Sequence, residues 1–132
     1  TLWSLIDPTL KHVVWQSVSD YRCIPYFTTD KSCQLFDDCL KKLSQKIDDF
    51  PMKRFIIISH HLPSSQLIHK KYIYCSINSA FVTDTEIAYS PQIIAWVAGH
   101  THTPLEKDKF HVNPVGYPGE NQMTDYNKTF TI

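Results

Sequence analysis

The sequence has no excess of charge of either sign. Its 132 residues include 13 lysines and arginines and 13 aspartates and glutamates, so the formal net charge is zero with neutral histidines. A balanced chain creates no global field that would attract a polyanion such as nucleic acid or an anionic membrane surface. A nucleic-acid partner is therefore not indicated.

Long apolar runs are also missing. The longest are short segments such as Phe55–Ile58 and Ile93–Ala98, whereas a helix that crosses a bilayer needs about 20 apolar residues. The sequence contains no basic and then apolar leader with a small-residue cleavage site. These absences predict a soluble, cytoplasmic protein without a membrane partner.

Paired cysteine motifs are absent as well. Four cysteines occur, Cys23, Cys33, Cys39 and Cys75, without a CxxC pair or a regular spacing. A chain that can build an apolar core has no need of disulfides, so we expect thiols in a reducing compartment. A zinc site of Cys33, Cys39 and a histidine has little support from the spacing.

The chain has no initiator methionine and opens with Thr1-Leu2-Trp3-Ser4, an apolar stretch. Native termini are more often polar and frayed. We therefore interpret the 132 residues as a piece of a longer protein.

The residues that are present predict a globular α/β fold, since 42% are hydrophobic and 13% are aromatic. Apolar side chains recur at steps of three and four between Leu35 and Phe50, which predicts a helix that starts near Asp30. Asp30 or Ser32 can cap its start, and Pro51 stops it.

Two β-branched runs, Phe55–Ser59 and Ile93–Ala98, predict strands that are buried on both faces. Alternating helix and strand predicts layered α/β packing. The weaker expectations are irregular structure with short elements over 2–26, a loop over 68–78, helical character over 80–89, and short strands over 110–112, 115–117 and 128–132.

Each of the two main strands runs into a loop that contains histidines. The first loop begins with His60-His61, and the second is Gly99-His100-Thr101-His102. Loops at the carboxyl ends of neighbouring strands converge, so His60, His100 and His102 are expected to approach one point. Neutral imidazoles bind zinc, iron and manganese. In an extended loop, His100 and His102 would project to the same side, and Gly99 would permit a tight turn before them.

The residues in and around these loops resemble the calcineurin-like metallophosphoesterases. Segment 56–64 is similar to their late strand and histidine loop, and segment 96–102 is similar to their Gly-His-x-His motif. Four further segments resemble one small, cytosolic-type subgroup in the same order: 1–4, 19–22, 80–86 and 113–118. The resemblance covers nearly the whole chain but only the second half of the family's domain.

The resemblance implies half of a four-layer αββα sandwich, of which residues 1–132 form the C-terminal portion. It implies a hydrolase that splits phosphomonoesters or phosphodiesters, including nucleotides, with a hydroxide held by two divalent metal ions such as Mn, Fe or Zn. His60 and His100 would ligate one metal and His102 the other. His61, Gly99 and Asn113 would support the ligands or lie at the rim of the site.

Two departures from the family pattern matter. The Asp-x-His, Gly-Asp and Gly-Asn-His-Asp/Glu segments of the family's N-terminal half do not occur here. Without a bridging carboxylate two adjacent cations repel strongly, so this piece alone is expected to be inactive and to need the missing half. Val115 stands where related sequences commonly carry arginine.

Two other readings stay open. The chain could be a scaffold or assembly module that keeps the phosphoesterase fold without its catalysis. It could also be a metal-binding domain in which His60, His100 and His102 share one zinc with a fourth ligand or a water. His12, His69 and His111 match no ligand and are interpreted as structural or exposed.

Overall fold

A computed structural model describes residues 2–120 and 127–130 of the chain. Its helices are η1 (Pro8–Leu10), α1 (Lys11–Ser17), α2 (Asp20–Cys23), α3 (Thr29–Asp49), η2 (Ser65–Leu67), η3 (Lys70–Tyr72), η4 (Asn78–Ala80) and η5 (Glu86–Tyr89). Its strands are β1 (Phe55–Ile58), β2 (Ile93–Ala98), β3 (Leu105–Lys107) and β4 (Phe110–Val112). The predicted α/β class is therefore confirmed.

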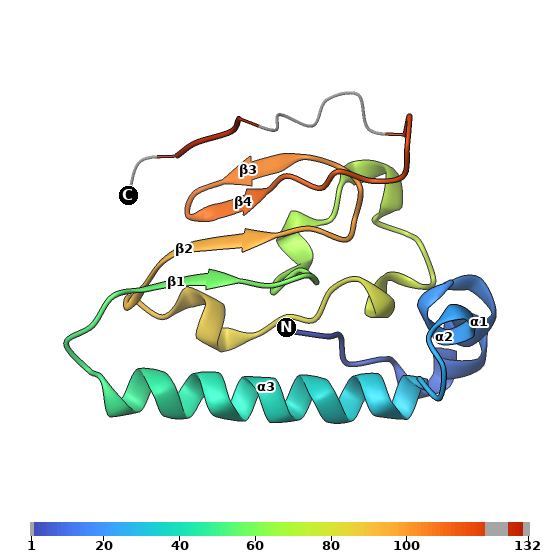
Figure 1. The fold of residues 1–132 in the computed structure, drawn as a ribbon, viewed down its shortest axis with the longest axis horizontal. Coiled ribbons are helices and arrows are strands. Elements are labelled where there is room, and N and C mark those ends of the chain that lie inside the picture. The colour runs from blue at the N-terminus through green and yellow to red at the C-terminus, as the bar shows by residue number, and fades with distance from the viewer. Residues whose placement is uncertain (1, 121–126, 131–132) are drawn as a thin grey trace.

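The four strands form one sheet in the order β1-β2-β4-β3. The pairs β1–β2 and β2–β4 are parallel, and β3 is antiparallel to β4. The long helix α3 runs alongside the sheet, and the carboxyl ends of the parallel strands point toward the corner that holds α1 and α2 (Figure 1). This corner is where the histidine loops begin.

Helix α3 is the element that the sequence predicts best. Its buried and half-buried apolar side chains face the core, although Phe50 at its end is 41% exposed. The predicted caps are wrong, because the helix begins one residue earlier than expected. Thr28 is the N-cap, and its Oγ1 accepts a hydrogen bond from the Lys31 amide at 3.1 Å.

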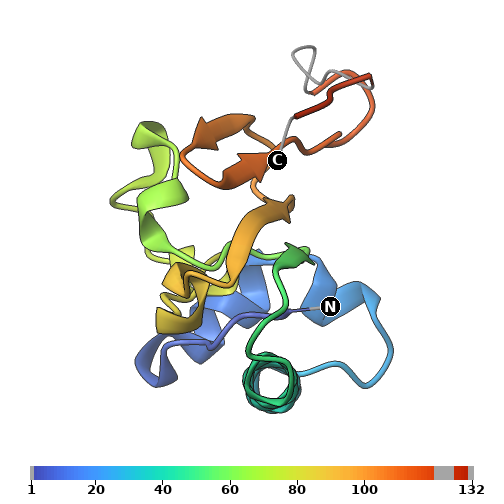
Figure 2. The same cartoon turned by 90° about the vertical axis from the view of Figure 1, so that its left-hand side faces the viewer.

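One face of the sheet is buried and the other is open. Trp96, Phe110 and Val112 lie in the main core with residues of α3, and segment 65–90 also covers this face (Figure 2). On the opposite face of β1, Ile56 is 47% exposed and Ile58 is 78% exposed. The prediction that this strand is buried on both faces is therefore wrong: β1 is an edge strand, covered on one side only.

Some of the weaker predictions are confirmed and others are wrong. The N-terminal segment holds only short helices, and β4 spans 110–112 as predicted. No strand forms over 115–117 or over 128–130, and the rest of the latter prediction, 131–132, lies outside the described residues. Strand β3 was missed because Leu105–Lys107 is too short and polar to show alternation. None of the four cysteines forms a disulfide.

The N-cap of α3 gives a direct test of how the helix starts. Thr28→Ala removes the acceptor of the Lys31 amide and should lower the free energy of unfolding by about 1 kcal/mol, while Thr28→Ser should cost much less. Urea denaturation followed by circular dichroism measures both. Equal losses in the two variants would show that the hydroxyl contributes nothing at this helix end.

Candidate metal site and pocket

The two histidine loops are joined directly by the backbone. The Gly99 amide donates a hydrogen bond to the His60 carbonyl at 3.0 Å. This contact extends the parallel pairing of β1 and β2 by one step beyond the strands, where Ser59 already donates to Val97. The imidazole rings of His60 and His100 consequently lie 4.6 Å apart between centroids. The predicted convergence of these two loops is present in the structure.

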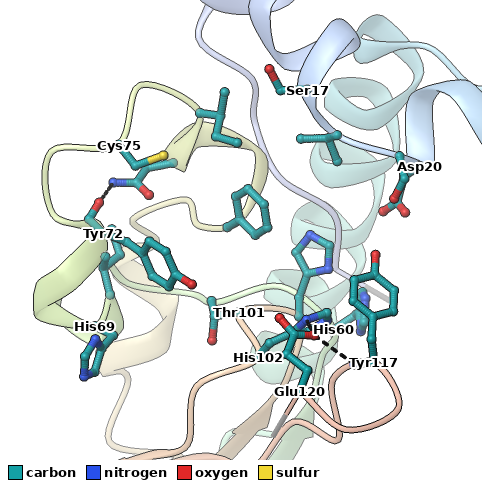
Figure 3. Close-up of a pocket in the computed structure, with 17 residues that line it drawn as sticks. Ser17, Asp20, His60, His69, Tyr72, Cys75, Thr101, His102, Tyr117 and Glu120 are labelled. Atoms are coloured by element: carbon teal, nitrogen blue, oxygen red, sulfur yellow. Dashed lines mark hydrogen bonds and ion pairs between the residues drawn. The ribbon is translucent and has the colours of Figure 1, made fainter.

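A pocket of about 460 Å³ opens beside the histidines. In Figure 3, His60, His102, Tyr117 and Glu120 gather at one side of it, whereas His69, Tyr72 and Cys75 lie at the other. The residues that line it are Ser17, Val18, Ser19, Asp20, His60, Ile68, His69, Tyr72, Cys75, Ile77, Asn78, Phe81, His100, Thr101, His102, Tyr117 and Glu120. All three predicted ligands therefore face one cavity.

His100 is half-buried at the centre of the cluster, with its ring against those of His60, His61 and Phe81. Burial, reinforced by His61, His60 and His102, lowers the pKa of its imidazole to about 2, although a hydrogen bond with the Ala80 backbone opposes this shift. Its Nε2 atom is buried and has no hydrogen-bond partner among the described residues. A neutral ring with a nitrogen that no other group engages is the form in which histidine ligates a metal.

His61 has a structural role. The side chain is 1% exposed, and its Nδ1 lies 3.0 Å from the Leu2 carbonyl, to which it donates when protonated there. Burial, with a smaller effect from His60, lowers the pKa of this imidazole to about 4. The expectation that His61 supports the loop agrees with these contacts, which tie the N-terminal segment to the back of the site.

Two consecutive buried hydrogen bonds fix the first histidine loop to the sheet. Trp96 Nε1 donates to Ser59 Oγ at 2.8 Å, and Ser59 Oγ donates to the His61 carbonyl at 2.7 Å. Trp96 is 1% exposed, so its indole N–H has no access to water. These two hydrogen bonds connect Trp96 of β2 to the loop that carries His60 and fix the loop against the strand.

The second loop is not extended, and the expectation drawn from extended geometry is wrong. His100 and His102 both have left-handed backbones, with φ of 64° and 52°. His102 is also half-buried and turns toward Glu120, whose carboxylate lies 2.8 Å from its Nδ1. Because the Tyr117 amide donates to the same carboxylate at 2.9 Å, Glu120 joins His102 to the turn that follows Asn113.

Gly99 and Asn113 form backbone contacts next to the predicted ligands. A Cβ atom at Gly99 would lie 3.9 Å from His60 Nδ1, an ordinary contact distance, so steric room does not demand glycine. The left-handed residues in the loop are the histidines instead. Asn113 donates from its amide to the Ala98 carbonyl at 3.4 Å, which places it just beyond β4 and beside the base of the second loop.

The histidine set fits part of a metal site. Neutral rings suit divalent ions, since burial also lowers the pKa of His60, partly offset by Asp20. Yet within residues 2–120 and 127–130 no three His, Cys, Asp or Glu side chains are arranged to hold an ion. The alternative of a zinc bound by Cys33, Cys39 and histidine has no such cluster in the described part of the chain either.

Sequence reasoning missed two acidic residues and an aromatic wall at the pocket. Asp20 lies near enough to His60 to offset part of the lowering of its pKa by burial, and Glu120 pairs with His102. Asp20 falls in segment 19–22, which carries part of the family resemblance, so a signal existed. Nothing in local spacing marks Tyr72 as a wall residue, because segment 68–78 has no clear periodicity.

The remaining predictions concern three histidines that match no ligand, and Val115. His12 is exposed, and His111 stacks on Phe130 at 4.0 Å on the open face of the sheet. His69 lines the pocket, but its Nδ1 accepts a hydrogen bond from the Lys71 amide at 3.3 Å. Val115 is 53% exposed and is not one of the pocket's lining residues.

Comparisons with known proteins identify one similar sequence. The chain is 31% identical over 116 residues to uncharacterized protein L509 of Acanthamoeba polyphaga mimivirus, an alignment that covers 77% of this chain. The chain spans 41% of the length of that relative. No family model matches the chain, and no solved structure matches it.

Over the described ranges, no helix combines the length and the apolar character that crossing a bilayer requires.

The buried imidazole of His61 makes stability depend on pH. Its folded pKa of about 4 lies below the ordinary value of 6.5, so the unfolded chain binds the proton more readily. Stability is full above pH 6.5 and falls as the pH drops through 4, by about 3 kcal/mol. His61→Asn can keep the bond to Leu2 without titrating, since its amide nitrogen takes the place of Nδ1, so urea midpoints should fall less steeply between pH 6.5 and 4. Identical pH profiles would contradict this assignment.

Proposed function

We propose that this chain supplies the histidine side of a divalent-metal site in a metal-dependent phosphoesterase. The observation that carries the proposal is the buried Nε2 of His100, which has no partner among the described residues and belongs to a pocket that His60 and His102 also line. A buried polar atom without a hydrogen-bond partner lowers the stability of the folded state. Here such an atom, His100 Nε2, belongs to a residue that shares a pocket with two further imidazoles. A metal ion is the partner that suits a neutral imidazole nitrogen.

The proposed division of roles is the one that the family resemblance implies, and the contacts are compatible with it. His60 and His100 lie 4.6 Å apart and would hold one ion, while His102 would hold a second near Glu120. His61 remains outside this set because its Nδ1 is engaged by the Leu2 carbonyl and the ring is fully buried. In this proposal the imidazoles of His60, His100 and His102 hold the ions in position and do not transfer protons.

Divalent ions in such a site polarise a phosphate ester and activate water for attack. The residues of this chain would bind and orient the ester in the 460 Å³ pocket, with the phosphate at the side of His60 and His102. The low pKa of His100 keeps its ring neutral at physiological pH, so the pocket floor presents a lone pair and no extra positive charge.

Two neighbouring ions also need anionic ligands between them. The acidic residues that line the pocket are Asp20 and Glu120, and Glu120 is engaged by His102 and the Tyr117 amide. We therefore infer that bridging carboxylates come from the N-terminal half of the same domain. The exposed Ile56 and Ile58 support this view, since a second sheet on that face would complete an αββα sandwich.

A scaffold or assembly module is the second candidate. It is favoured by the absence, among the described residues, of any three-ligand metal cluster. The two candidates differ in the residues upstream of this chain: carboxylates of the Asp-x-His and Gly-Asp kind support the enzyme, and their replacement supports the scaffold. The cysteines without disulfides agree with the reducing, intracellular location that we propose for either.

Metal binding is tested by titrating Zn²⁺ into the protein while recording histidine ring signals by NMR. His100→Gln should raise the Zn²⁺ dissociation constant on the order of 10–100-fold, because the bare nitrogen is lost. His69→Gln is the matched control, since His69 lines the same pocket but lies on its far side. Equal affinities in both variants would remove His100 from the ligand set.

Hydrolysis is tested with bis-p-nitrophenyl phosphate and Mn²⁺. Residues 1–132 alone should bind the metal weakly and show no turnover, because the charge between two ions would be uncompensated. The complete protein should release p-nitrophenol, and His60→Gln in it should abolish that release. Clear turnover by the 132-residue chain would overturn the assignment of carboxylates to another segment.

A further inference from the structure

The pocket has two chemically different sides. His60 and His102 occupy one side, and His69, Tyr72 and Cys75 of segment 68–78 lie at the other (Figure 3). The same segment contributes the apolar side chains of Ile68 and Ile77 to the lining. A ligand that fills the cavity must therefore combine a group for the imidazole side with a nonpolar body.

Three aromatic side chains line the pocket. Two of them contact the imidazoles: Phe81 stacks against the His100 ring, with centroids 4.7 Å apart and planes inclined by 27°, and Tyr117 meets the His102 ring edge-on at 4.9 Å. Tyr72 is 38% exposed, although it lines the cavity, so part of its ring surface is open to an incoming molecule. Rings in these positions favour a flat, aromatic group over a bulky aliphatic one.

Two polar atoms of this segment are engaged within it. The Asn78 side-chain Nδ2 donates to the Tyr72 carbonyl at 2.7 Å and to the Ile73 carbonyl at 3.4 Å. His69 Nδ1 accepts from the Lys71 amide. These bonds hold the segment together and leave the Tyr72 ring and the side chains of Ile68 and Ile77 as the nonpolar contacts that it offers a ligand.

We propose that the pocket selects phosphate esters whose organic group is an aromatic ring, with Tyr72 as a residue that determines specificity. This inference rests on the proposed function for the position of the phosphate group. The ring would lie against Tyr72, while the phosphate lies beside His60 and His102. A cavity of about 460 Å³ has room for both parts.

The test uses the complete protein and two phosphonates that cannot be hydrolysed, phenylphosphonate and cyclohexylphosphonate. They share one charged group and differ in whether the six-membered ring is flat. Ligand-observed NMR gives dissociation constants with and without Zn²⁺. We expect phenylphosphonate to bind about fivefold more tightly than cyclohexylphosphonate in both conditions.

Variants in one loop provide the matched comparison. Tyr72→Ala should abolish the preference for the flat ring, whereas Tyr74→Ala should retain it, because Tyr74 is 99% exposed and does not line the pocket. Both side chains are exposed enough for their removal to spare the core.

The outcomes separate the two proposals. Equal binding of the two phosphonates, no binding of phenylphosphonate, or a preference that survives Tyr72→Ala would overturn the aromatic-ring inference. Affinities that do not change with Zn²⁺, together with a preserved ring preference, would instead support the pocket and count against the metal function.

Discussion

The site depends on the hydrogen bond between the Gly99 amide and the His60 carbonyl at the end of the β1–β2 pair. Parallel strands deliver their carboxyl ends to the same edge of a sheet, but they do not by themselves bring the following loops together. This bond continues the pairing into the loops and sets the spacing of His60 and His100. The contacts of His61 with Leu2, and of Ser59 with Trp96, hold the same loop from behind.

Burial and chemistry are linked within the cluster. Desolvation is the largest cause of the low pKa values of His60, His61 and His100, and the rings further disfavour one another's protonation. Their packing therefore keeps these imidazoles neutral, although Asp20 opposes the shift at His60. The ring of His61 is oriented by a backbone group, the Leu2 carbonyl.

Much of the fold could be predicted because its signals are local. The periodic apolar positions of α3 and the β-branched run of β2 gave both elements nearly to the residue. Strand β1 has the same local signal, yet its exposure depends on its being at the edge of the sheet, which is a property of topology. The convergence of His60 and His100 followed from strand order, whereas the left-handed loop backbone and the wall formed by Tyr72 did not. Loop conformation is set by contacts distant in sequence, such as that of Glu120 with His102.

The left-handed backbones of His100 and His102 have a further meaning for the balance between stability and ligand binding. A side chain with a Cβ atom costs on the order of 1 kcal/mol in this conformation, whereas glycine adopts it freely. Glycine at both positions would relieve this backbone strain, but it would also remove the packing of the His100 ring against Phe81 and the contact of His102 with Glu120. The side chains of the two histidines therefore hold the loop in a conformation that their own backbones disfavour.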